Sequence, residues 1–155
     1  MIRLQIVAVG EDKDRWVSDG LDHFQKLLSR WARLDWVVVP TVRTGNLPPS
    51  EIMKSEAERL HKHLGKGLTV ALTDTGEAFD SPAFARKLEQ WQVHSGGRIQ
   101  FVIGGPHGLH DGILQQADIR LSLSPLTFSH RIVRLVLAEQ LYRALSILHG
   151  TNYHK

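Results

Sequence analysis

Short apolar segments alternate with helical segments along the chain, and this alternation constrains the fold more than any other feature. The apolar segments are rich in β-branched residues on both faces, which is typical of parallel strands that are covered on both sides. We therefore predict an α/β fold, a mostly parallel sheet with helices on both faces, in one domain over residues 1–155. The predicted strands are 2–9, 34–39, 68–73, 98–103 and 119–123.

Helical periodicity fills the stretches between the strands. The predicted helices are one capped by Asp12 or Asp14 that runs to about Trp31, one over 51–64, one from Ser81 past Trp91, and two over 111–117 and 130–148. Ser50, Ser81 and Ser129 stand where helix caps are expected. Residues 41–49 are predicted to form a loop, and 74–76 a turn that ends the third strand.

The composition limits the classes of protein that need to be considered. The chain has 155 residues and no cysteine, which excludes a disulfide framework, a thiolate metal site and a cysteine nucleophile. Residues 1–9 are too short and too polar for a signal peptide, and no apolar run has the length of a membrane span. We expect a cytoplasmic protein that does not bind a membrane.

Three loops are expected to meet at one edge of the sheet. Ligands of parallel sheets bind at the carboxyl ends of the strands, and the loops 73–76, 104–108 and 124–128 leave those ends. Glycine lets the main chain approach a ligand closely, and the loop Ser124–Phe128 is more apolar than a surface loop usually is. The three loops are the candidate cofactor cradle.

The last helix combines an apolar character with a basic charge. Its polar side chains do not gather on one side, so we expect it to be buried on more than one side, either within the domain or at a dimer interface. The formal net charge of +3 lies entirely in residues 130–155, which carry four basic side chains and one acidic one. Such asymmetry favours a polyanionic partner.

Several familiar catalytic motifs are absent from the sequence. It contains no G-x-G-x-x-G after a strand, no phosphate-binding P-loop motif and no G-x-S-x-G motif. His107 and His110 are spaced as metal ligands can be, but no carboxylate or third histidine accompanies them, and His61 and His63 point to different faces of a helix. We therefore expect no bound metal.

Several motifs taken together resemble one family over the whole chain. They are I-G-G-P-x-G at 103–108, L-S-x-L-T at 123–127, His130, the run E-Q-L-Y-R-A at 139–144 and the ending Tyr153-His154-Lys155. Each is weak alone, but together they resemble the small SPOUT-type methyltransferases that act on a pseudouridine of bacterial large-subunit ribosomal RNA.

The resemblance implies a fold, a cofactor and a partner. It implies a homodimer with a trefoil knot near the C-terminus, a feature that general topology rules would not suggest. It also implies S-adenosylmethionine as methyl donor and methyl transfer to N3 of a pseudouridine in helix 69 of 23S rRNA, on the assembled ribosome. The positions that would bind the cofactor are Leu72, Gly104, Leu123, Ser124, Pro125, Leu126, Thr127 and Phe128.

Residues near the C-terminus are the candidates for catalysis and RNA binding. His154 is the first candidate for the base, or for an orienting group, because histidine titrates near neutral pH and a tail can reach a neighbouring subunit. Tyr153 is a candidate for stacking on the target base. The other RNA-binding candidates are His130, Arg131, Arg134, Arg143 and Lys155, although one of the arginines could instead pair with Glu139.

The sequence departs from the family pattern at two positions. Ser129 precedes His130 where relatives often have proline, and Pro125 stands where a small residue is familiar; both affect the expected shape of the cofactor loop. Two other readings stay open. One is a SPOUT methyltransferase that acts on tRNA, and the other is a ribosome-associated RNA-binding dimer without catalysis.

Overall fold

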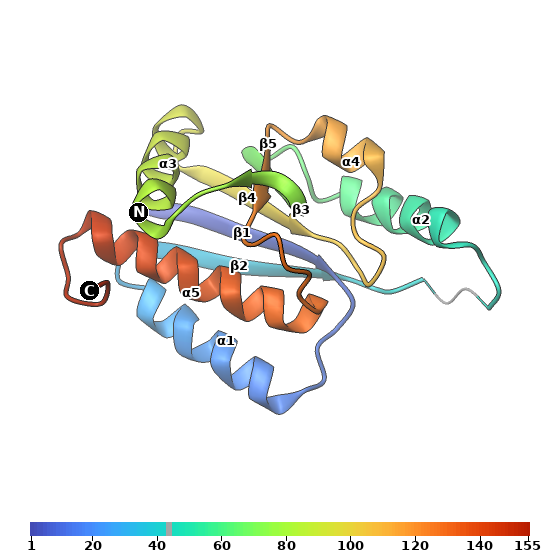
Figure 1. Cartoon of the computed structure of the whole chain (residues 1–155), viewed down its shortest axis with the longest axis horizontal. Coiled ribbons are helices and arrows are strands. Elements are labelled where there is room, and N and C mark those ends of the chain that lie inside the picture. Colours follow the sequence, from blue (N-terminus) through green and yellow to red (C-terminus); the bar gives the residue numbers. More distant parts are fainter. Residues whose placement is uncertain (43–44) are drawn as a thin grey trace.

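The computed structural model describes residues 1–42 and 45–155, and in them strands and helices alternate as predicted (Figure 1). Apart from the third strand, the predicted bounds differ from the observed ones by up to three residues at an end, which is ordinary for helix and strand termini. The elements are β1 Ile2–Val9, α1 Arg15–Leu28, β2 Ala32–Val39, α2 Pro49–His61, β3 Leu68–Ala78, α3 Ser81–His94, β4 Arg98–Ile103, α4 Asp111–Gln116, β5 Ile119–Ser122 and α5 His130–Leu148. The predicted loop 41–49 includes positions 43 and 44, which lie outside the described residues.

The strands form one parallel sheet in the order β2-β1-β4-β3-β5. Successive side chains of a strand point to opposite faces, and β1 shows this clearly. Ile6 packs in a core with α1, α3 and α5, whereas Val7 packs in a second core with α2 and α4. The predicted parallel sheet with helices on both faces is confirmed.

The third strand is longer than predicted, because residues 74–76 do not form a turn that ends it. β3 continues to Ala78 and pairs with β5 on both sides of an irregularity between Leu72 and Glu77. A side chain at Gly76 would lie 2.8 Å from the main chain of Arg120 and Leu121. The glycine therefore allows a close approach of two strands, which the sequence alone does not distinguish from a turn.

Of the predicted helix caps, two are wrong and Ser129 is confirmed, while Asp14 is the N-cap of α1 but makes no side-chain cap bond. Pro48, not Ser50, is the N-cap of α2, and it makes no side-chain cap bond. Asp80 rather than Ser81 caps α3 and accepts a 2.8 Å hydrogen bond from the main chain. Ser129 caps α5 as predicted.

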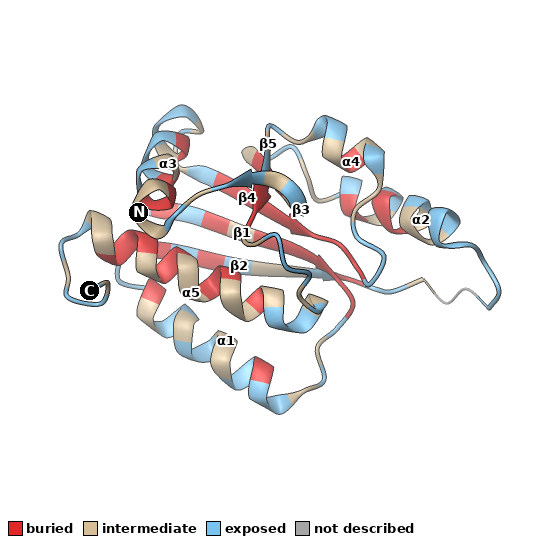
Figure 2. Ribbon diagram, in the orientation of Figure 1, coloured by how far each residue is buried: buried red, intermediate tan, exposed pale blue. Residues whose placement is uncertain are grey.

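Helix α5 is buried within the chain on more than one side (Figure 2). It lies against the sheet between α1 and α3, and Leu137, Leu141 and Leu145 are almost fully buried. The contact with α1 is close enough that a side chain at Gly20 would meet Leu135 at 2.6 Å. Of the two alternatives for this helix, burial within the domain is what the structure shows. Within residues 1–42 and 45–155, no helix combines the length and apolar character that a membrane crossing requires.

Candidate active site

A cavity of about 660 Å³ lies at the carboxyl ends of β4 and β5, beside residues 72–74 within β3. It is bordered by these parts of the strands, the loop after β4, the loop after β5 and the first turn of α5. Its lining residues are Leu72, Thr73, Asp74, Ile103, Gly104, Gly105, Pro106, His107, Gly108, Leu109, Leu114, Leu121, Leu123, Ser124, Leu126, Thr127, Phe128, Ser129, His130 and Val133. Its volume is in the range of small-molecule and cofactor sites.

The cavity gathers most of the residues that were predicted to bind a cofactor. Seven of the eight line it, namely Leu72, Gly104, Leu123, Ser124, Leu126, Thr127 and Phe128, while Pro125 does not. The loop that carries five of them is held by its own serines. Ser122 donates to the carbonyl of Ser124, whose hydroxyl in turn accepts from the main-chain N–H of Leu126 at 3.0 Å. The side chain of Leu126 is 72% exposed at the cavity, so it is available to cover an apolar ligand.

Gly104 brings two main-chain segments together on one wall of the cavity. A Cβ atom at this position would lie 2.6 Å from the carbonyl carbon and oxygen of Gly108. Gly105 and Gly108 form an isolated bridge, and Gly108 has a φ of +84°, which favours glycine. The loop is therefore a tight structure whose main-chain groups are presented at the edge of the cavity.

His130 and Arg131 stand at the start of α5, beside the cavity. Burial, together with the charges of Arg134 and Arg131, lowers the pKa of His130, so its imidazole is neutral at neutral pH. Arg131 forms an ion pair with Asp14 and joins the starts of α5 and α1. A neutral His130 is suited to hydrogen bonding rather than to holding a phosphate by charge.

Arg134 is buried inside the domain, whereas a residue that binds RNA has to be exposed. It is 2% exposed, and its guanidinium donates to the carbonyls of Val9 and Gly10 at 2.8 and 2.6 Å. These carbonyls end β1, so Arg134 fastens the start of α5 to the sheet. The structure does not favour the prediction that Arg134 contacts RNA, because its charge is directed inward.

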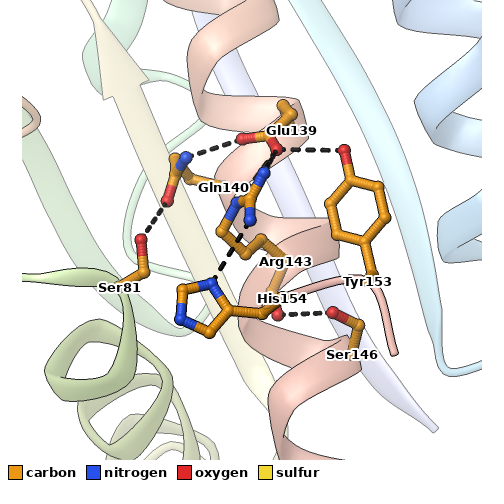
Figure 3. Close-up of polar contacts among 7 residues, drawn as sticks. All are labelled: Ser81, Glu139, Gln140, Arg143, Ser146, Tyr153 and His154. Carbon is orange, nitrogen blue, oxygen red and sulfur yellow. Dashed lines mark hydrogen bonds and ion pairs between the residues drawn. The ribbon is translucent and has the colours of Figure 1, made fainter. Parts of the chain in front are cut away.

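The C-terminal tail folds back on the second half of α5 (Figure 3). Arg143 donates two hydrogen bonds to Glu139 Oε1, and the Tyr153 hydroxyl donates to the same oxygen at 3.0 Å. The bond to Glu139 is the main reason that the pKa of Arg143 is raised, and burial is the main reason that the pKa of Tyr153 is raised. The prediction that one arginine pairs with Glu139 is confirmed for Arg143. Lys155 is exposed.

The ring of His154 is oriented by Arg143. Arg143 Nη1 lies 3.3 Å from His154 Nδ1, and a guanidinium can only donate hydrogen bonds. Nδ1 therefore accepts, and in the neutral ring the proton is on Nε2. In this arrangement His154 presents a hydrogen-bond donor, which suits an orienting group better than a base.

The tail and the cavity lie at opposite ends of α5 in one chain (Figure 1). Val133 lines the cavity, while His154 contacts Arg143, which is ten positions further along α5 and therefore about 15 Å away from Val133. The structure thus brings the predicted cofactor residues together with His130, but it does not bring Tyr153, His154 or Lys155 to the same cavity.

The family of the chain follows from its sequence. The family model described as "Predicted SPOUT methyltransferase" matches residues 2–154. The chain belongs to the SPOUT methyltransferase family. This is the family that the sequence motifs resemble, and the observed fold agrees with it.

Named relatives of this SPOUT methyltransferase match it from end to end. A protein of Alkalilimnicola ehrlichii named ribosomal RNA large subunit methyltransferase H is 41% identical, and the match covers 99% of both chains. A protein of the same name from Acetivibrio thermocellus is 38% identical over 99% of this chain and all of its own. Among solved structures, a probable methylase family protein from Haemophilus influenzae superposes with a TM-score of 0.55 at 12% identity, covering 98% of this chain and 70% of its own, which shows the shared fold.

Two histidines of the loop after β4 have roles that the sequence did not reveal. His110 caps α4, and its Nδ1 accepts a 3.0 Å hydrogen bond from Gly112. His107 lines the cavity, as does Asp74, and neither was predicted as a site residue. The available signal was that both lie in the segments 73–76 and 104–108, which were predicted as loops of the cofactor cradle, although Asp74 is within β3. Within the described residues, no three His, Asp or Glu side chains are grouped so that they could hold a metal ion.

The buried carboxylate of Glu56 lies next to Gly105 in the loop after β4. Glu56 of α2 is 4% exposed, and its Oε1 has no hydrogen-bond partner among the described residues. A Cβ atom at Gly105 would lie 2.6 Å from Glu56 Oε2, so the glycine leaves room for the carboxylate. Burial raises the pKa of Glu56, and the charges of His107 and Arg59 oppose that rise.

We expect Glu56→Gln to raise the free energy of unfolding by on the order of 1 kcal/mol at pH 8. The folded state binds a proton at Glu56 at a pH where the unfolded chain does not, so lowering the pH stabilises the parent protein. The difference in unfolding free energy between the variant and the parent should therefore become smaller from pH 8 toward pH 5. Urea unfolding at several pH values measures this. Glu58→Gln, on the exposed side of the same helix, is the control, and an advantage independent of pH would contradict the prediction.

Proposed function

We propose that this chain transfers a methyl group from S-adenosylmethionine to N3 of a pseudouridine in helix 69 of 23S rRNA. The observation that carries the proposal is the cavity at the carboxyl ends of the strands, in a chain of the SPOUT methyltransferase family. Relatives named ribosomal RNA large subunit methyltransferase H support the choice of ribosomal RNA. We further propose that it acts in the cytoplasm on the assembled ribosome.

The residues around the cavity fit S-adenosylmethionine, which supplies a methyl group already activated on a positively charged sulfur. Leu72, Leu123, Leu126 and Phe128 provide apolar surface suited to a flat ring. The close main-chain packing at Gly104 leaves N–H and C=O groups, rather than side chains, to bind polar edges. Asp74, which also lines the cavity, would supply a carboxylate for a positively charged ligand. No metal is needed for this chemistry.

The work of the protein is then to position the acceptor base and to stabilise the negative charge that develops on it as its N3 proton passes to water. His154, with its ring set by Arg143, would donate from Nε2 to a uracil carbonyl oxygen as negative charge develops there. Tyr153 would stack on the base. Arg131 and Lys155 remain candidates for phosphate contacts, since both are exposed.

We propose that the active unit is a homodimer in which the tail of one subunit serves the cavity of the other. Within one chain the tail lies about 15 Å of helix away from the cavity. Trp16 and Ile132, at the starts of α1 and α5, are 57% and 43% exposed, and exposed apolar surface of this kind marks interaction sites. The trefoil knot in the loops around the cavity also stays a prediction.

The proposed function is tested with ribosomal RNA from a strain that lacks this chain. We expect mass spectrometry to show one pseudouridine of helix 69 without its methyl group, and the purified protein with S-adenosylmethionine to restore it on isolated ribosomes. Transfer RNA from the same strain is the control and should be unchanged. A normal helix 69 in the deletion strain, or loss of a tRNA methyl group instead, would overturn the proposal.

A further inference from the structure

We propose that a second RNA-binding surface, distinct from the cavity, lies at the amino ends of the strands. It consists of Arg3, Arg33, Lys66 and Arg98, which we call the basic row. Its ligand is the phosphate backbone of the RNA that carries the methylated base. The inference rests on the proposed function in that it assigns this surface to the same RNA substrate.

The sheet places three of these side chains next to one another. Arg3 is in register with Arg33 on one side and with Arg98 on the other. Residues in register on parallel strands point to the same face, and neighbouring strands are about 4.8 Å apart. All three side chains are exposed, so three positive charges stand side by side on the face of the sheet that α2 and α4 cover at its other end.

A fourth cation is added by the turn before β3. Gly67 packs against Arg98 so closely that a Cβ atom would lie 2.6 Å from the Arg98 carbonyl oxygen. Lys66, which precedes this glycine, donates its main-chain N–H to Gln100 Oε1 at 3.0 Å. These two contacts fix the lysine beside the row, where its side chain is exposed.

The row borders a cavity of about 320 Å³ with a fixed polar floor. Gln100 is buried, and its Nε2 donates to Gln5 Oε1 at 2.6 Å and to the His63 carbonyl at 2.7 Å. Because the oxygen of Gln5 accepts this bond, its amide nitrogen is left as a donor in the cavity. Cations around a further donor form the chemistry that binds a phosphate group.

The fold itself gives no reason for this arrangement. Like charges directly opposite one another on neighbouring strands are destabilising. Asp35 pairs with Arg33 at 3.2 Å, whereas the side chains of Arg3 and Arg98 have no hydrogen-bond or ion-pair partner in the described part of the chain. A bound polyanion would relieve the repulsion that remains.

The distance between the two surfaces suits a large RNA. Arg98 begins β4 and Ile103, at its end, lines the cofactor cavity, so the row and the cavity are about 17 Å apart along that strand. A base held at the cavity and a phosphate held at the row therefore need a folded RNA rather than a single nucleotide. Contacts with phosphates give affinity and register without reading sequence.

The test compares the full-length parent with the double variant Arg3→Gln/Arg98→Gln on large ribosomal subunits from the deletion strain. We expect KM for the subunits to rise about tenfold, with kcat and the affinity for S-adenosylmethionine unchanged. The slope of log affinity against log salt should fall by about 1 for each cation removed. The thermal midpoint should stay equal or rise, because repulsion is removed, and this excludes misfolding as the cause.

Lys26→Gln/Arg86→Gln removes the same charge from the exposed surfaces of α1 and α3 and is the matched control. If the row variant and the control have the same KM and the same salt slope, the basic row does not bind RNA and the inference is overturned. Failure of the proposed function looks different, since the parent protein itself would then leave helix 69 unmethylated.

Discussion

Removal of Tyr153, His154 and Lys155 is expected to lower the rate of rRNA methylation by at least about 100-fold and to leave the affinity for S-adenosylmethionine within twofold of the parent. No residue of the tail lines the cavity, so the cofactor loses none of its contacts within its own chain. A positioned proton-transfer or hydrogen-bonding group typically contributes about 10² to 10⁴ in rate. Single-turnover methylation and calorimetry with S-adenosylmethionine measure the two quantities.

The truncation also removes contacts that hold the tail, so its effect on stability has to be known. The lost polar contacts are the bonds of Tyr153 and His154 to Glu139 and Arg143 on the surface of α5, and partly exposed polar pairs of this kind contribute about 1 kcal/mol or less. The truncation also removes the packing of the Tyr153 ring against Tyr142 and Arg143. Removal of Lys155 alone keeps these contacts and is the matched control. Normal turnover by the longer truncation would show that the tail has no part in catalysis.

Mixed dimers decide whether the tail acts within its own subunit or across the interface. One chain would lack residues 153–155 and the other would carry Gly104→Ala, a variant with an impaired cavity. If the tail serves the partner, the truncated chain has an intact cavity and receives an intact tail, so one active site per mixed dimer is restored. If the tail serves its own chain, the mixture is no more active than the two variants assayed separately. The separation of tail and cavity along α5 favours the first result.

The fold was largely predictable because its signals are local and repeated. Five apolar runs separated by helical periodicity specify a parallel sheet with both faces covered, and each run was found as a strand. The main error, at residues 74–76, has a physical reason. Glycine permits both a tight turn and the close approach of two strands, and only the pairing of β3 with β5 shows that Gly76 does the second.

The candidate site was predictable in part. Strand ends in a parallel sheet converge on one edge, so the loops after β4 and β5 could be expected to meet, and they do. The predicted third loop is instead part of β3, which contributes Leu72, Thr73 and Asp74 to the cavity. The direction in which each arginine side chain points could not be predicted in the same way. A basic side chain on a helix that is buried on several sides faces the interior or the solvent according to the rotation of the helix. Arg134 is consequently tied to the end of β1, whereas Arg143 orients the tail.

The replacement Gly104→Ala is expected to weaken S-adenosylmethionine binding about 10- to 100-fold. The added methyl group would lie 2.6 Å from the main chain of Gly108 and 2.9 Å from that of Leu109. Main-chain atoms cannot rotate away as a side chain can, so the loop itself has to move. Overpacking of this kind costs about 1–3 kcal/mol, and each 1.4 kcal/mol corresponds to about a factor of ten in affinity.

Gly20→Ala supplies the matched control, because its new methyl group would meet only the flexible end of Leu135, and neither residue lines the cavity. Both variants add one carbon to a close contact, but only Gly104→Ala reshapes the loop that borders the cavity. Calorimetry on the two variants separates the effects. Equal affinities would mean that the loop after β4 is not part of the cofactor site. A loss confined to Gly104→Ala would place the cofactor against the main chain of residues 104–108, where Gly104 packs too closely against Gly108 and Leu109 to leave room for a side chain of its own.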